Sequence, residues 1–158
     1  MYTVAILTIS DRCSRGERED VSGKLIQELI SGLALENARY EIVPDEPDII
    51  KAKLIEYCDT LKVDLVLTTG GTGFTPRDNT PEATLAVIDK EVPGIPEVMR
   101  LECLKFSRRA MLSRAVAGIR KGKLIINLPG SAKAVKESLG IILDTLIHAL
   151  DMIRGKDH

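Results

Sequence analysis

The sequence has few of the residues that many catalytic and structural sites use. Its 158 residues contain no tryptophan, two histidines and three cysteines. His148 and His158 lie in the last helix-like segment and in the tail, away from every motif, so histidine acid–base catalysis and a Ser-His-Asp triad are poor hypotheses. Cys13, Cys58 and Cys103 are odd in number and lack metal-type spacing. They argue for a reducing compartment and against both a disulfide framework and zinc.

The sequence also lacks a large excess of positive or negative charge, and it lacks long apolar runs. The formal net charge is −1, so the chain has no basic footprint for nucleic acid. No stretch approaches the roughly 20 apolar residues of a membrane span, and the N-terminus is typical of a strand rather than of a signal peptide. With 44% hydrophobic and 28% charged residues, the composition is that of an ordinary globular chain. We expect a cytoplasmic protein whose residues 1–158 form one domain.

Strand and helix patterns alternate along the first half of the chain. Residues 3–9, 40–43 and 63–69 are short apolar runs typical of buried strands. Residues 21–33 and 47–61 carry apolar side chains at helical spacing. Such alternation implies parallel strands joined by right-handed crossovers. The sequence therefore predicts a three-layer, doubly wound α/β fold, with a mostly parallel sheet and helices on both faces.

The second half predicts two further helices, a hairpin and a long last helix. The helices run from residue 81 to about 89 and through 98–104. Residues 112–119 and 123–128 are typical of strands joined by a tight turn, which predicts one antiparallel hairpin. The last helix begins after Ser131, a good N-cap, and we expect residues 154–158 to form a frayed tail. N–H groups at Gly130 and Ser131 could hold a phosphate, although an ordinary helix cap is the alternative.

A glycine-rich loop follows the central strand. The segment 63–81, VDLVLTTGGTGFTPRDNTP, leads an apolar run into Gly70, Gly71, Thr72 and Gly73. Glycines let the backbone approach a ligand and point successive N–H groups into one concavity, which favours a phosphate. The sequence after the last glycine excludes both a Walker loop and a dinucleotide fingerprint. A tight turn without a ligand remains the alternative.

Polar residues from three strand ends should converge on this loop. In doubly wound sheets, ligands bind beyond the carboxyl ends of the strands where the winding reverses. That rule places Ser10 and Asp11, after the first strand, beside the glycine loop, and Asp45, after the second strand, on the same rim. Asp78 follows the loop itself. Acids beside a phosphate site favour a bound Mg²⁺, although each one alone could be a turn or cap residue.

Several segments together resemble the molybdopterin adenylyltransferase family of the MogA/MoaB type, and the corresponding domain of gephyrin. They are ILTISDR (6–12), PDE (44–46), TTGGTGFTPRDNTPEATLAVID (68–89), PG (93–94), LSRAVAGIR (112–120) and LIINLPGSAKAVKE (124–137). The resemblance implies an enzyme of molybdenum cofactor biosynthesis. Such an enzyme transfers AMP from ATP to the terminal phosphate of molybdopterin, releases pyrophosphate and uses Mg²⁺.

The resemblance also assigns residues by motif. Asp45 and Asp78 match the acids associated with Mg²⁺ and catalysis, and Ser113 and Arg114 match the segment associated with the pterin substrate. The positions expected to bind the nucleotide are Ser10, Asp11, Gly70, Gly71, Thr72, Gly73, Gly130 and Ser131.

The resemblance further implies a homotrimer that passes its product to a molybdenum insertase. MoaB-type members share the glycine loop yet have been given other roles, so a non-catalytic molybdopterin-binding or scaffolding trimer is the alternative. A nucleotide-sugar or dinucleotide pyrophosphatase is a third and weaker one.

Overall fold

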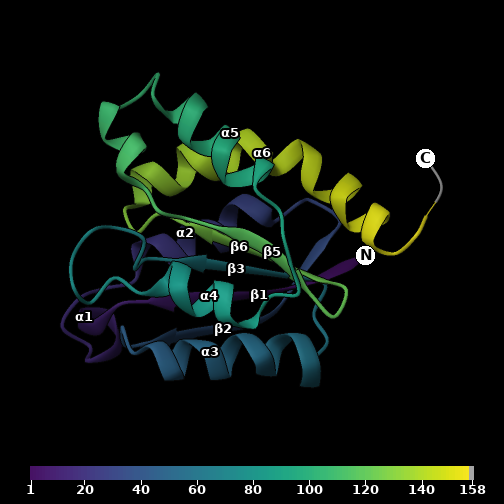
Figure 1. The fold of residues 1–158 in the computed structure, drawn as a ribbon, viewed down its shortest axis with the longest axis horizontal. Helices are drawn as coiled ribbons and strands as arrows, with labels where there is room; N and C mark the ends of the chain where they lie inside the picture. The colour runs from purple at the N-terminus through teal and green to yellow at the C-terminus, as the bar shows by residue number, and fades with distance from the viewer. Residues whose placement is uncertain (157–158) are drawn as a thin grey trace.

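A six-stranded sheet forms the middle of the protein in the computed structural model, which describes residues 1–156 (Figure 1). The strands lie in the order β2-β1-β3-β6-β5-β4. They are β1 (Tyr2–Ile9), β2 (Leu35–Val43), β3 (Leu65–Thr69), β4 (Lys90–Glu91), β5 (Ala117–Arg120) and β6 (Lys123–Leu128). The pairs from β2 to β6 are parallel, and β6-β5 and β5-β4 are antiparallel. The predicted mostly parallel sheet with an antiparallel hairpin is confirmed.

Helices cover both faces of this sheet. One face carries α2 (Val21–Ile30), α5 (Gly94–Cys103) and α6 (Ala132–Ile153), and the other carries α3 (Pro47–Ile55) and α4 (Thr80–Val87) (Figure 1). The short α1 (Asp11–Ser14) follows β1, a π-helical turn (Glu56–Thr60) continues α3, and a 3-10 helix (Arg108–Leu112) precedes β5. Within residues 1–156, no helix has both the length and the apolar character to cross a membrane.

The alternation of side chains along β1 explains the two cores. Val4 and Ile6 pack into the cluster under α2, α5 and α6, while Ala5 and Leu7 pack into the cluster under α3 and α4. Successive strand residues point to opposite faces, so a strand covered on both sides must be apolar throughout. The nearly continuous apolar run at residues 3–9 is therefore the signal that both faces are covered.

The predicted strand at residues 112–119 is wrong in its first half, because β5 begins only at Ala117. The preceding carbonyls are bound by a side chain instead of a neighbouring strand. Arg100 Nη1 donates to the carbonyl oxygens of Ser113 (3.3 Å) and Ala115 (2.8 Å), and the Arg114 N–H donates to the carbonyl of Thr72 (2.9 Å). Residues 113–116 are therefore ordered without being a strand.

The ends of other elements also differ from the predictions. β2 begins at Leu35 rather than at residue 40, and the α-helical part of the segment 47–61 ends at Ile55. The tail is not frayed over residues 154–156, since Arg154 Nη2 donates to Asp64 Oδ2 (2.8 Å) and Lys156 pairs with Asp151 (2.9 Å). His158, expected in that tail, lies outside the described residues.

Candidate active site

The glycine loop leaves β3 in a conformation that requires glycine. Gly70 and Gly71 have φ values of 98° and 69°, and a Cβ on Gly70 would lie 2.2 Å from the carbonyl oxygen of Ile9. The buried Thr80, at the start of α4, holds this turn from behind. Its hydroxyl donates to the Gly70 carbonyl (2.9 Å), and its N–H donates to the Gly71 carbonyl (3.2 Å). The positive φ values and the hydrogen bonds from Thr80 thus both hold Gly70 and Gly71 in place.

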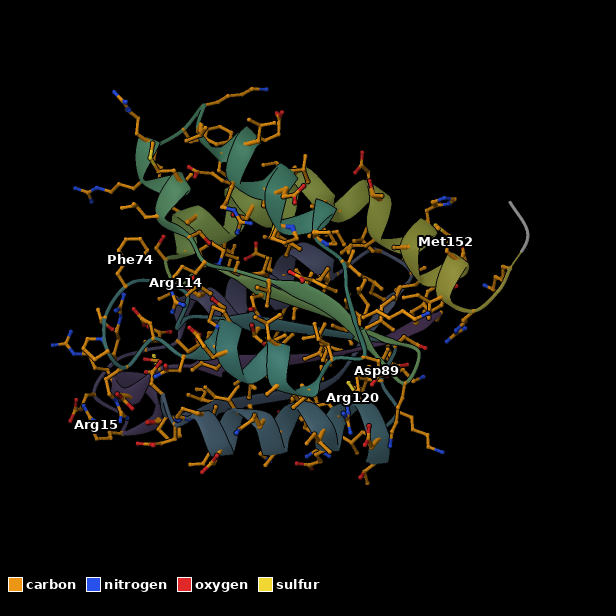
Figure 2. The ribbon with its side chains drawn as sticks, viewed as in Figure 1. Arg15, Phe74, Asp89, Arg114, Arg120 and Met152 are labelled. Atoms are coloured by element: carbon orange, nitrogen blue, oxygen red, sulfur yellow. The ribbon has the colours of Figure 1, made fainter. Side chains whose placement is uncertain are left out.

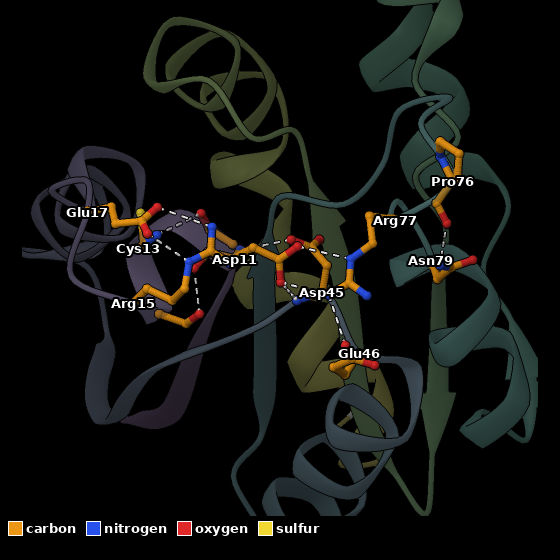
Figure 3. Close-up of polar contacts among 11 residues, drawn as sticks. Asp11, Cys13, Arg15, Glu17, Asp45, Glu46, Pro76, Arg77 and Asn79 are labelled. Atoms are coloured by element: carbon orange, nitrogen blue, oxygen red, sulfur yellow. Dashed lines mark hydrogen bonds and ion pairs between the residues drawn. The ribbon is translucent and has the colours of Figure 1, made fainter.

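The loops after β1 and β2 are joined by a reciprocal pair of hydrogen bonds. The Asp11 N–H donates to Asp45 Oδ2 and the Asp45 N–H donates to Asp11 Oδ1, both at 3.0 Å (Figure 3). Arg77, from the loop after β3, donates to both Asp11 oxygens at 3.0 and 2.9 Å and pairs with Glu46 at 2.9 Å. The predicted convergence of the loops after the first three strands is present.

The acids of this cluster have different electrostatic environments. Hydrogen bonds from the Arg77 side chain and the Asp45 main chain lower the pKa of Asp11. Burial raises the pKa of Asp45, and the nearby charges of Asp11 and Asp78 raise it further. A partly buried carboxylate beside like charges is stabilised by a cation placed against it. The charge of Asp45 is therefore less well compensated than that of Asp11.

Asp45 and Asp78 both lie against the glycine loop. A Cβ on Gly71 would be 3.3 Å from Asp45 Oδ1, and a Cβ on Gly73 would be 2.9 Å from Asp78 Oδ2. Among the described residues there is no group of three or more His, Cys, Asp or Glu side chains placed to hold a metal ion. One or two carboxylates with substrate phosphates are, however, the usual ligands of Mg²⁺. The donor set of Asp45 and Asp78 fits that ion.

A smaller cavity, of about 270 Å³, lies on one side of the glycine loop. The first residues of α2 and α6 form part of its wall, so two helix N-termini border the same space. Exposed N–H groups and the helix dipole make such ends favourable for anions. The predicted nucleotide residues in its wall are Ser10, Gly70, Gly130 and Ser131.

A larger cavity, of about 460 Å³, lies between the glycine loop, α5 and the start of α6. Predicted site residues in its wall are Thr72, Gly73, Ser113 and Ser131. Apolar side chains line it together with basic ones. The apolar residues include Pro96, Met99 and Leu112, and the basic ones are Arg100, Arg109 and Lys133. Ser131, whose side chain caps α6 by accepting from the Ala134 N–H at 3.2 Å, lines both cavities.

The structure separates the predicted site residues into groups. Asp11, Asp45 and Asp78 form the acid cluster beside the loop, and Arg114 binds the loop through its side chain. These four residues and Gly71 line neither cavity. The basic residues of the larger cavity were not predicted. They come from α5, from the 3-10 helix and from α6, and no local motif marks them.

A doubly wound sheet with a glycine loop and carboxylates at its switch point is the architecture of an α/β protein that binds a phosphate-bearing ligand. Residues 5–149 match the model of a family described as a probable molybdopterin binding domain, and the chain belongs to that family. The resemblance noted in the sequence is thereby confirmed.

Individual relatives agree with this assignment. The chain is 48% identical over 154 residues to molybdopterin adenylyltransferase of Helicobacter pylori (strain J99), which covers 96% of this chain and 88% of that protein. The crystal structure of the molybdopterin biosynthesis enzyme MoaB of Thermus thermophilus is 51% identical, has a TM-score of 0.94, and covers 99% of this chain and 98% of its own. Gephyrin of Dictyostelium discoideum is 41% identical over 98% of this chain, which corresponds to 23% of gephyrin.

Proposed function

We propose that the chain is a molybdopterin adenylyltransferase, which transfers AMP from ATP to the terminal phosphate of molybdopterin and releases pyrophosphate. The observation that carries this proposal is the pair of cavities that meet at Ser131, each lined by a different group of the predicted residues. A transfer between two substrates needs two adjoining sites whose reacting ends face each other. A protein that only binds molybdopterin would need one.

ATP occupies the smaller cavity in this proposal. The features that favour a nucleotide are the glycine loop and the N-terminus of α6, both of which can donate N–H groups to phosphate oxygens. The N-terminus of α2 is already capped by the carboxylate of Asp20. Gly70 belongs to that wall, while Gly73, farther along the same loop, belongs to the wall of the larger cavity. The loop would thus lie along the phosphates that react.

Molybdopterin occupies the larger cavity. Apolar side chains there can cover a flat ring, and Arg100, Arg109 and Lys133 can bind its phosphate. Ser113 lies in the same wall, in agreement with its predicted role. The terminal phosphate of molybdopterin would reach the α-phosphate of ATP at the boundary beside Ser131.

Asp45 and Asp78 would hold Mg²⁺, which supplies charge neutralisation to the phosphates. Both reacting groups are negatively charged, so the work of the protein is to hold them in line and to compensate their charge. Main-chain N–H groups of the glycine loop and basic side chains of the larger cavity contribute to the second task. No side chain needs to form a covalent intermediate.

Pyrophosphate release from ATP, with and without molybdopterin, tests the proposal. Release should depend on molybdopterin and should fall about 100-fold or more in Asp78→Asn and in Asp45→Asn, the size of loss typical for removing one electrostatic stabiliser. Asp144→Asn, which changes an exposed acid on α6, is the matched control and should keep full activity. Molybdopterin binding without any release would favour the scaffolding alternative instead.

We further propose a cytoplasmic homotrimer that delivers adenylylated molybdopterin to a molybdenum insertase. Exposed apolar side chains on α5 and the segment after it support self-association, since large apolar patches on a protein surface usually mark an interface. This α5 patch consists of Val98, Leu101, Leu104, Phe106, Met111 and Leu112.

A further inference from the structure

We propose that Arg114 is a positioning residue that fixes the loop carrying Asp78, rather than a residue that contacts the pterin; the inference rests on the function proposed above. Arg114 Nε donates to the Gly73 carbonyl (2.8 Å), and Nη2 donates to the Asp78 carbonyl (2.7 Å). Nη1 pairs with Glu82 in the first turn of α4. The Arg114 guanidinium therefore binds the main chain at both ends of the segment 73–78.

Apart from Arg114, the segment 72–78 is tied to other loops by the exposed side chain of Arg77, which pairs with Asp11 and Glu46. Three hydrogen bonds lie within this segment or at its end: Thr75 N–H to Asp78 Oδ2 (2.9 Å), Asp78 N–H to the Thr75 carbonyl (3.0 Å) and Asn79 Nδ2 to the Pro76 carbonyl (3.1 Å). Phe74 at its tip is 68% exposed. Throughout residues 1–156, the main chain from residue 72 to 78 is hydrogen-bonded from outside the loop by Arg114 alone.

Arg114 itself stands on a rigid base. Arg100 holds the carbonyls on either side of it, at Ser113 and Ala115. Two residues later, the Val116 N–H donates to Oδ1 of the fully buried Asn127 on β6 (3.2 Å). The main chain at Arg114 is thus fixed to the sheet and to the wall of the larger cavity. Because its side chain binds the Asp78 carbonyl, Asp78 is held relative to the same elements.

The planar guanidinium is suited to this task because its N–H groups point along fixed directions and can bind two carbonyls at once. An ammonium group has the same charge but is a compact point donor on a flexible chain. Loss of Arg114 should therefore release Asp78 and so weaken the binding of the metal and nucleotide, with a smaller effect on the larger cavity through Gly73. A residue that contacts the pterin would instead affect molybdopterin binding.

The absence of tryptophan from the chain allows a direct test of loop order. Phe74→Trp places a single tryptophan at the exposed loop tip, and its fluorescence anisotropy reports the mobility of the loop without any need for activity. Arg114→Ala in this background should lower the anisotropy, and low concentrations of free guanidinium ion should restore it. Arg114→Lys should give an intermediate value.

Arg120 provides the matched control at the other end of the sheet (Figure 2). Its guanidinium also binds a carboxylate and a carbonyl, donating to Asp59 at 3.0 and 2.7 Å and to the Val87 carbonyl at 2.8 Å. Arg120→Ala should therefore cost stability by the same chemistry while leaving the anisotropy of the loop tryptophan unchanged. A general loss of stability is thereby separated from loosening of the loop.

Binding and kinetics complete the test. In Arg114→Ala, the affinity for Mn²⁺-ATP measured without molybdopterin should fall about 10-fold or more, as for loss of a residue that orients a metal ligand. The kcat should fall about 100-fold, while the KM for molybdopterin should change by a smaller factor than the affinity for Mn²⁺-ATP. Unchanged anisotropy and Mn²⁺-ATP affinity with a raised KM for molybdopterin would overturn the inference. If the unsubstituted protein shows no transfer at all, the proposed function fails, and the anisotropy still decides whether Arg114 holds the loop.

Discussion

Asp11 and Asp45 share a pair of hydrogen bonds, yet their charges have opposite effects on the folded state. Arg77 stabilises the charge of Asp11 and lowers its pKa, whereas burial raises the pKa of Asp45. A carboxyl whose pKa is lowered by folding stabilises the protein above its unfolded pKa, and one whose pKa is raised opposes folding once it is ionised. The site thus contains one acid that supports the fold and one that opposes it.

We predict that Asp45→Asn stabilises the protein at pH 7 and that Asp11→Asn destabilises it. Asn at position 45 can still accept the hydrogen bond from the Asp11 N–H, but it removes the partly buried charge. Urea denaturation should give a higher midpoint for Asp45→Asn and a lower one for Asp11→Asn. The advantage of Asp45→Asn should disappear as the pH falls through the raised pKa of Asp45, because the wild-type carboxyl is then neutral. A lower midpoint at pH 7 would contradict this account.

A stabilising Asp45→Asn that loses activity would also explain why an acid stands there. Groups with poorly compensated charge are common at functional sites, where a ligand or metal ion completes the compensation. The sequence correctly predicted that Asp45 lies beside Asp11 and the glycine loop, since strand order alone determines which loops meet. It could not indicate that Asp11 is already neutralised, because the partner is Arg77, 66 residues away.

The glycine loop acts as one element with β1 and α4. Gly70 needs a positive φ and also lies against the Ile9 carbonyl, whereas Gly32, with a φ of 83°, has open space where a Cβ would lie, with no contact within 4 Å. A substitution at Gly32 therefore tests backbone strain alone, whereas a substitution at Gly70 tests backbone strain together with a steric clash.

Gly32→Ala should cost about 1–2 kcal/mol, the strain of a left-handed residue. Gly70→Ala should cost at least about 3 kcal/mol, because overpacking adds to that strain. Chemical denaturation of both variants measures the difference. Equal losses would mean that the loop can shift away from β1, and the rigid arrangement described here would be wrong.

Elements with a regular apolar period were predictable, and those held by side chains were not. Residues 113–116 are an example. Ala115 and Val116 lead directly into β5 and suit a strand, but Arg100 and the glycine loop take the hydrogen bonds that a strand would need. The short α1 and the two-residue β4 were missed for a different reason. Segments of this length carry too few residues for a period to be recognised.

At the scale of the whole molecule, the strand order was largely implied by the alternation of patterns in the first 70 residues. Parallel strands with right-handed crossovers leave few arrangements, and the reversal between β1 and β3 falls where the loops carry glycines and acids. The two cavities could not be predicted, because their walls combine α2, α5 and α6, which the sequence does not place relative to one another.

The homotrimer that we propose leads to a prediction about the α5 patch. The protein should have the mass of three 17.3 kDa chains in sedimentation experiments, and Leu101→Glu should reduce that mass. Leu101 is 64% exposed, so a charge there is tolerated by the single chain but not in an apolar interface. Met152→Glu, at an exposed site near the end of α6 (Figure 2), is the control and should keep the assembly. A single-chain mass for the unsubstituted protein would exclude the trimer.

The transfer of labelled phosphate from ATP to molybdopterin tests the central claim most directly. ATP labelled at the α-phosphate should transfer its label to molybdopterin, and ATP labelled at the γ-phosphate should release its label as pyrophosphate in equal amount. Both results require the two cavities to bring the substrates together. Molybdopterin that is bound but acquires no label would contradict the claim, and the protein would then be a binding module.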